Sequence, residues 1–146
     1  MIILENMKKV TFLLGLMIFA GFSAFAQKPE HLDEAGFKSK VYDFDKNKTW
    51  KYEGTTPAIV DFYADWCGPC RYVAPFLEQL ASEYGTKIKV YKVNTDNSPR
   101  VASAFGIKGI PTFLFIPAKG EPKKMVGAME KSGFESEING HMKVAK

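Results

Sequence analysis

The chain contains two cysteines, Cys67 and Cys70, which are separated by Gly68 and Pro69 and preceded by Trp66. A Cys-x-x-Cys pair can cycle between a dithiol and a disulfide. The thiolate, and not the thiol, is the nucleophile in that chemistry, so one of the two sulfurs must ionise readily. The pattern therefore predicts thiol–disulfide exchange, in which Cys67 attacks a disulfide and Cys70 resolves the mixed disulfide that results.

Three alternatives to redox chemistry fit the cysteine pair less well. A structural disulfide normally closes a longer loop, because a loop of two residues removes little entropy from the unfolded chain. A zinc site needs four ligands, and the histidines His31 and His141 lack the spacing that would place them with the cysteines. A chance pairing does not account for the Trp before the pair and the Gly-Pro inside it. We therefore expect redox catalysis, no metal ion and no cofactor.

The segments on either side of the pair would position it. Residues 58–64 form a continuous apolar run, which is typical of a strand covered on both faces. A helix should follow, and its apolar stripe consists of Val73, Phe76, Leu77, Leu80, Ala81 and Tyr84. Cys67 would then lie at the helix N-terminus, where free N–H groups and the helix dipole favour a thiolate. Pro69 would rigidify this turn, and Gly85 would end the helix.

The remaining elements complete a mixed α/β pattern. We expect strands at residues 87–94, 112–116 and 123–127, and a short helix from Ser98-Pro99 to Gly106. Ser132 and Glu135 form a capping box for a last helix, with Phe134, Ile138 and Met142 inside. The order strand, helix, strand, helix, strand, strand, helix predicts a mixed central β-sheet flanked by helices on both faces.

The segment that precedes this pattern is less clear. Residues 28–38 are polar and would form a short helix or an arm, and residues 39–44 would form a weak first strand. Residues 46–56 resemble a loop in composition, although Trp50 and Tyr52 should pack against the body of the protein.

Residues 1–26 have the composition of a secretory signal peptide. Lys8 and Lys9 precede the apolar residues 10–22, and Ala-Phe-Ala at residues 24–26 provides a cleavage site. The alternative is an uncleaved membrane anchor, because residues 10–27 carry no charge over 18 residues. Small residues within the stretch favour cleavage, and either Met1 or Met7 could be the start. We expect a single domain at residues 27–146, without stable membrane insertion after cleavage.

Composition excludes several classes of protein. Of the 146 residues, 46% are hydrophobic and 25% charged, which excludes disorder. Two cysteines cannot build a disulfide-rich scaffold. The net charge of +4 falls to +3 without residues 1–26, because Lys8, Lys9 and Glu5 leave together. Such a small, scattered surplus excludes a nucleic-acid-binding surface.

Residues 59–70, Ile-Val-Asp-Phe-Tyr-Ala-Asp-Trp-Cys-Gly-Pro-Cys, resemble the active-site segment of thioredoxins, and so does Gly-Ile-Pro-Thr at residues 109–112. The similarity extends over about residues 41–142. It implies the thioredoxin fold and dithiol–disulfide exchange with protein substrates. The chain departs from the family in Tyr63, where thioredoxins often have Trp, in the lack of a clear first helix, and in its secretory segment.

The resemblance gives Asp61 and Lys92 roles beside the cysteines. Asp61 lies within an apolar strand, where burial should raise its pKa, and the resemblance implies that it accepts the proton of Cys70. The alternative is an aspartate that caps a strand edge. Lys92 shares a strand face with Ile88 and Val90, so it either points towards Asp61 in a supporting role or is an ordinary solvated lysine.

The resemblance also implies a client-binding surface. Pro111 would form a cis peptide bond facing the cysteines, and the backbone of Ile110 would pair with the client as an added strand. The alternative for Pro111 is an ordinary proline at the start of a strand. The apolar surface would consist of Trp66, Gly68, Pro69, Ile110, Gly127 and Ala128. For Trp66 alone, core packing and client contact are equally compatible with the sequence.

These features predict a secreted or periplasmic thiol–disulfide oxidoreductase. Gly-Pro between the cysteines resembles the reducing thioredoxins, so we expect a monomeric reductant of disulfide-containing client proteins. A reductant outside the cytoplasm needs a source of electrons, and a membrane thiol carrier would supply them. Two alternatives remain open: a disulfide oxidant or isomerase, and a non-enzymatic holdase or assembly subunit that uses the apolar surface.

Overall fold

The computed structural model describes residues 27–146, and the predicted signal peptide at residues 1–26 lies outside the described residues. The elements follow in the order β1 (Glu30–His31), α2 (Glu34–Lys40), β2 (Ala58–Tyr63), α3 (Gly68–Tyr84), a 3₁₀ turn (Gly85–Lys87), β3 (Lys89–Asn94), α4 (Pro99–Ala104), β4 (Thr112–Ile116), β5 (Lys123–Val126) and α5 (Lys131–Gly140). Among the described residues, no helix is both long enough and apolar enough to cross a membrane.

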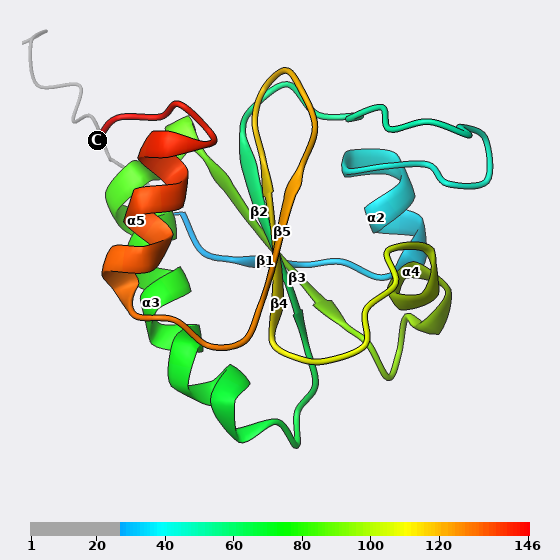
Figure 1. Ribbon diagram of the computed structural model, residues 1–146, viewed down its shortest axis with the longest axis horizontal. Coiled ribbons are helices and arrows are strands. Elements are labelled where there is room, and N and C mark those ends of the chain that lie inside the picture. The colour runs from blue at the N-terminus through cyan, green and yellow to red at the C-terminus, as the bar shows by residue number, and fades with distance from the viewer. Residues whose placement is uncertain (1–26) are drawn as a thin grey trace, which may run out of the picture.

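The five strands form one mixed sheet in the order β1-β3-β2-β4-β5. Strand β3 runs parallel to β1 and β2, whereas β4 is antiparallel to both β2 and β5. Helices α3 and α5 cover one face of the sheet, and α2 and α4 cover the other (Figure 1). The predicted mixed sheet with helices on both faces is confirmed.

Each face of the sheet has its own apolar core. On the α3 and α5 side, side chains of β2 and β4 such as Ile59 and Phe113 pack with Val73, Leu77 and Phe134. On the other side, Phe62 of β2 packs with Phe37 of α2, and the half-buried Trp50 and Tyr52 close that core, as the sequence predicted. Alternate side chains of a strand point to opposite faces, so β2 contributes to both cores. This double burial explains its continuous apolar sequence.

The predicted strand at residues 39–44 is wrong. Helix α2 continues to Lys40, and the first strand is instead the short β1. Asp33 caps the helix, because its carboxylate accepts a hydrogen bond from the backbone N–H of Gly36 at 2.7 Å. Phe37 and Val41 are both fully buried one helical turn apart. The apolar residues of this segment therefore follow the spacing of a helix rather than the alternation of a strand.

The predicted capping box of the last helix is also wrong. Helix α5 begins at Lys131 after Glu130, so Ser132 lies inside the helix and caps nothing. The Glu135 carboxylate pairs with the ammonium of Lys146 at 2.6 Å instead of turning back to the helix N-terminus. Met142 follows the helix yet is buried, as are Phe134 and Ile138.

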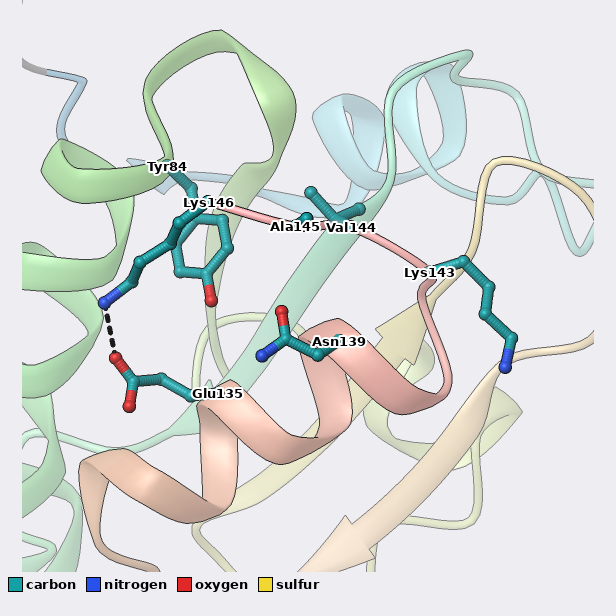
Figure 2. Close-up of a pocket in the computed structure, with 7 residues that line it drawn as sticks. All are labelled: Tyr84, Glu135, Asn139, Lys143, Val144, Ala145 and Lys146. Atoms are coloured by element: carbon teal, nitrogen blue, oxygen red, sulfur yellow. Dashed lines mark hydrogen bonds and ion pairs between the residues drawn. The ribbon is translucent and has the colours of Figure 1, made fainter.

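The chain end folds back over the helical layer formed by α3 and α5. Figure 2 shows Tyr84 of α3, Glu135 of α5 and the last residues of the chain around a shallow hollow. The Lys146 ammonium lies 2.6 Å from carboxylate oxygens of both Glu83 and Glu135, and 5.5 Å from the centre of the Tyr84 ring. These ion pairs fasten the C-terminal segment to the two helices.

Candidate active site

Cys67 lies at the N-cap of α3, immediately before Gly68 and Pro69. Its sulfur accepts a hydrogen bond from the backbone N–H of Cys70 at 3.2 Å. That N–H is one of the helix N-terminal donors without a partner inside the helix. A negative charge on the Cys67 sulfur is stabilised by this donor and by the positive end of the helix dipole. The local sequence thus places the sulfur that is predicted to be the nucleophile at the helix N-cap.

The two sulfurs form a disulfide in this structure, with 5.3 Å between the Cα atoms of Cys67 and Cys70. Both cysteines are largely buried, and Ala64, Tyr63 and Ile110 pack around them. Cys70 is on the inner side of the first helical turn, so it can reach the sulfur of Cys67 without rearrangement of the helix. The structure therefore corresponds to the product of resolution, the oxidised pair.

Asp61 is fully buried in β2, between its register partners Lys92 on β3 and Phe113 on β4. Within residues 27–146, neither carboxylate oxygen of Asp61 has a hydrogen-bond partner. The Lys92 ammonium is 3.6 Å from the nearer oxygen and forms an ion pair with it. Burial raises the pKa of Asp61 to about 6, and the Lys92 charge opposes that rise. The carboxylate can therefore take up and release a proton near neutral pH.

The strand register places Asp61 beneath the start of α3. Ile59 and Asp61 point to the same face of β2, because side chains alternate along a strand. Ile59 belongs to the core that contains Val73 and Leu77 of α3, so this face is the one that α3 covers. Asp61 is closer than Ile59 to the end of β2, where the chain turns into the cysteine segment. The arrangement suits proton transfer between Asp61 and Cys70.

The Ile110–Pro111 peptide bond is cis, and Pro111 is buried. Ile110 packs against the two cysteines, so the loop before β4 borders the disulfide. The Pro111 carbonyl accepts a hydrogen bond from the Gly127 N–H at 2.8 Å, and Thr112 Oγ1 donates to the Gly109 carbonyl at 2.6 Å. These bonds fix the loop beside the redox pair.

The predicted client surface surrounds the disulfide. Trp66 has 69% of its surface exposed, and its indole Nε1 donates a hydrogen bond to Asp96 at 2.9 Å, so this residue does not belong to the core. Gly68, Pro69 and Ala128 are exposed, whereas Ile110 and Gly127 are half-buried. A shallow groove runs beside Trp66 and is lined by Thr95, Ile107, Lys108, Gly109 and Ile110.

Sequence reasoning missed two residues of this surface. Val126, at the end of β5, is 68% exposed, and its side chain lies near Gly109. From the sequence, an apolar residue at the end of a short strand is only a weak signal of a binding surface, because an ordinary core residue would look the same. Asp96 orients Trp66 from the loop after β3. The sequence did carry a signal for this contact. Trp66 follows strand β2 and Asp96 follows strand β3, and the carboxyl ends of these parallel strands meet at one edge of the sheet.

Residues 27–146 contain no group of three or more His, Cys, Asp or Glu side chains arranged to hold a metal ion. The groups that this site offers for chemistry are the two sulfurs, the helix N-terminus and the buried carboxylate.

Comparisons with known proteins agree with this geometry. The thioredoxin family model matches residues 31–140. A thioredoxin from Borreliella burgdorferi is 45% identical over 107 residues, which cover 73% of this chain and 92% of that protein. Thioredoxin 1 from a Nostoc species is 40% identical over 109 residues, covering 75% and 92% of the two chains.

Solved structures agree as well. Chloroplastic thioredoxin z has a TM-score of 0.66 at 28% identity, with coverage of 81% of this chain and 96% of the other. A mutant thioredoxin from Halobacterium salinarum has a TM-score of 0.65 at 26% identity, with coverage of 83% and 96%. Thioredoxins act on disulfide-containing protein substrates through a Cys-x-x-Cys pair, which this chain carries at the start of α3. The chain therefore belongs to the thioredoxin family and is a thiol–disulfide oxidoreductase.

Proposed function

We propose that this chain works outside the cytoplasm, where it reduces the disulfides of client proteins. One observation carries the proposal: a Cys-Gly-Pro-Cys pair follows, in the same chain, a basic and then apolar segment of secretory composition. Gly68-Pro69 resembles the dipeptide of reducing thioredoxins and supports the direction of electron flow. The basic Lys8 and Lys9 and the Ala-Phe-Ala sequence at residues 24–26 support export and cleavage.

The first step is attack by Cys67. Its thiolate forms a bond to one sulfur of the client disulfide, and the other client sulfur leaves as a thiolate. The exposed Trp66 and the loop at Ile110 would hold the client strand across the disulfide. The product is a mixed disulfide between Cys67 and the client.

The second step is resolution by Cys70. Asp61 accepts the proton of the Cys70 thiol, and the Cys70 thiolate then attacks the Cys67 sulfur. The second client sulfur leaves, so the client has gained two electrons and the Cys67–Cys70 pair has lost them. The carboxylic acid of Asp61 then loses its proton to solvent or to the departing thiolate. Each cycle ends in the disulfide that the structure contains.

A further cycle requires two electrons from outside the protein. Reductants of the cytosol cannot reach an exported protein, so we propose that a membrane dithiol carrier reduces the Cys67–Cys70 disulfide. The carrier would use the same exposed surface as the client, because this surface borders the cysteine pair. The reaction needs one copy of the chain, and we propose that it acts as a monomer.

The resting redox state in the native host tests the proposal. Cells are quenched in acid, free thiols are alkylated with a reagent that adds mass, and the protein is located by fractionation. We expect a protein cleaved before Gln27, found outside the cytoplasm, with Cys67 and Cys70 mainly reduced. A chain that lacks residues 1–26 serves as the control and should stay inside the cell. A pair that rests oxidised would instead indicate a disulfide oxidant, and retention of the complete chain in the cytoplasm would contradict export.

A further inference from the structure

Three polar side chains lie in one row across the sheet beside the redox pair. Lys92 on β3 is the register partner of Asp61 on β2 and of His31 on β1, and both strand pairs are parallel. Register partners in a sheet point to the same face, so all three side chains face α3. Strand β1 has only two residues, and the second of them, His31, lies in this row.

Tyr63 joins the row from the end of β2. The Lys92 ammonium lies 4.5 Å from the centre of the Tyr63 ring, which is within the range of a cation–π interaction. The Tyr63 hydroxyl is 3.1 Å from Nδ1 of His31, and the two rings meet edge to face. The contacts therefore run without a gap from His31 to Tyr63, then to Lys92, and from Lys92 over 3.6 Å to Asp61.

A lysine beside a buried carboxylate needs such support. Its four-carbon chain is flexible, and fixing it in one position costs rotamer entropy. The Lys92 side chain is 14% exposed and lines a hollow together with His31 and Glu78 of α3. Without a partner on the Tyr63 side, the ammonium could turn towards water or towards the Glu78 carboxylate. Asp61 would then lose the positive charge that favours its ionised form.

We propose that His31 and Tyr63 are positioning residues, which hold the Lys92 ammonium beside Asp61 and so set the pH range in which Cys70 resolves the mixed disulfide. This inference rests on the role proposed above for Asp61. The titratable and charged groups that face the row come from every neighbouring element: Lys28 before β1, His31 on β1, Tyr63 and Asp65 at the end of β2, Lys92 on β3, and Cys67, Cys70 and Glu78 at and on α3.

The test is the rate at which a preformed mixed disulfide resolves, measured on the full chain in single turnovers between pH 5 and 9. Tyr63→Leu removes the aromatic ring beside Lys92. We expect the midpoint of its rate–pH profile to rise by about half to one pH unit. Below the midpoint, resolution should then be about three- to tenfold slower than in the native protein. Tyr63→Phe removes only the hydroxyl–imidazole contact, and His31→Ala removes that contact together with the edge-to-face ring contact. Both variants keep the Tyr63 ring beside Lys92, so each should shift the midpoint less. In His31→Asn, the side-chain amide can again bond the hydroxyl and should restore the native midpoint.

Matched controls separate this effect from general damage. Tyr42→Phe removes a hydroxyl that bonds the Asn47 carbonyl, and His141→Ala removes the other imidazole of the chain, which bonds the Glu121 carbonyl. Both should keep the native midpoint. Circular dichroism checks folding, and if Tyr63→Leu does not fold, Tyr63→Phe and His31→Ala decide the question.

Two further variants distinguish the possible failures. Lys92→Met should shift the midpoint at least as far as Tyr63→Leu, because it removes the charge itself. If Lys92→Met shifts the midpoint while the folded Tyr63 and His31 variants do not, the positioning role is overturned and the role of Asp61 stands. If Asp61→Asn keeps the native pH profile, the proposed role of Asp61 as proton acceptor is the part that fails.

Discussion

The molecule holds its carboxylates in two opposite ways. Glu83 and Glu135 lie on the surface between α3, α5 and the chain end, and each pairs with the ammonium groups of Lys131 and Lys146. Figure 2 shows the pair of Glu135 and Lys146. Hydrogen bonding to Lys131 holds the pKa of Glu83 below its usual value. Asp61 is buried beside the cysteines, without a hydrogen bond among the described residues, and burial raises its pKa to about 6.

This difference in environment separates carboxylates that hold the chain together from one that suits proton transfer. A carboxylate that is surrounded by lysines stays ionised and contributes to holding the chain end. A carboxylate that is buried with one ion pair destabilises the fold when it is charged, and it gains the ability to exchange a proton at neutral pH. The role proposed for Asp61, acceptance of the Cys70 proton, would account for this cost. Four predictions test this contrast, from the largest expected effect to the smallest.

The largest effect should follow from Cys70→Ser, which removes the thiol that is the proposed proton donor to Asp61. Cys67 can still attack, but no second sulfur is available to release the client. Turnover of a protein disulfide should stop, and adducts between Cys67 and client proteins should accumulate in the native host. Non-reducing gels read out the adducts, which should vanish with dithiothreitol. A complete absence of such adducts, with the protein folded, would contradict the catalytic cycle.

Asp61→Asn should slow resolution at pH 7 by about 100-fold, which is the lower end of the range for loss of a general base. The first attack by Cys67 should change little, because the helix N-terminus and not Asp61 stabilises that thiolate. Rapid-quench kinetics separate the two steps. Glu135→Gln is the matched control from the surface group, and it should resolve mixed disulfides at the native rate. Equal rates for both variants would remove the distinction between the two regions.

The same Asp61→Asn substitution should stabilise the fold at pH 7 by about 1–3 kcal/mol, since a shift of one pKa unit corresponds to about 1.4 kcal/mol. The raised pKa also fixes the sign of the pH dependence. The native carboxyl group contributes most stability below pH 3.8, and this contribution is lost as pH rises from 3.8 to about 6. Urea denaturation at several pH values should show this decline in the native protein and its absence in Asp61→Asn. An Asp61→Asn protein less stable than the native one at pH 7 would contradict the account.

Glu83→Gln should have the smallest effect and the opposite sign. The pKa of Glu83 is lowered, so its stabilising contribution is present above the usual value of 4.5 and is lost as pH falls. Exposed ion pairs are weak and screened by salt. We expect a small drop in the urea midpoint at low salt that disappears at high salt, while the effect of Asp61→Asn persists at both. Persistence of the Glu83 effect at high salt would argue against a purely surface role.

The sequence predicted those parts of the fold that depend on local patterns. Strand β4 has the predicted bounds, because Thr112–Ile116 is a continuous apolar run between turn residues. The burial of Asp61 followed from its apolar neighbours in the strand, and the position of Cys67 followed from the strand-to-helix boundary. Each of these inferences used residues that are close together in the sequence.

The parts that were missed depend on contacts between distant segments. Strand β1 consists of Glu30 and His31, which become a strand only by pairing with Tyr91 and Lys92. The contact of His31 with Tyr63 has no sequence signal for the same reason. Ser132 fits a capping box, but Glu135 pairs with Lys146 from the chain end. Asp96, which bonds the indole of Trp66, is thirty residues further along the chain.

The titration of the Asp61 carboxyl group tests the central claim most directly. The ¹³C resonance of its carboxyl carbon can be followed by NMR against pH in the oxidised protein and assigned by its absence from Asp61→Asn. We predict a midpoint near pH 6, where a buried carboxylate beside one lysine can exchange a proton with Cys70. A midpoint near the ordinary aspartate value of about 3.9 would mean that Asp61 stays ionised throughout and cannot accept the proton of Cys70 at neutral pH.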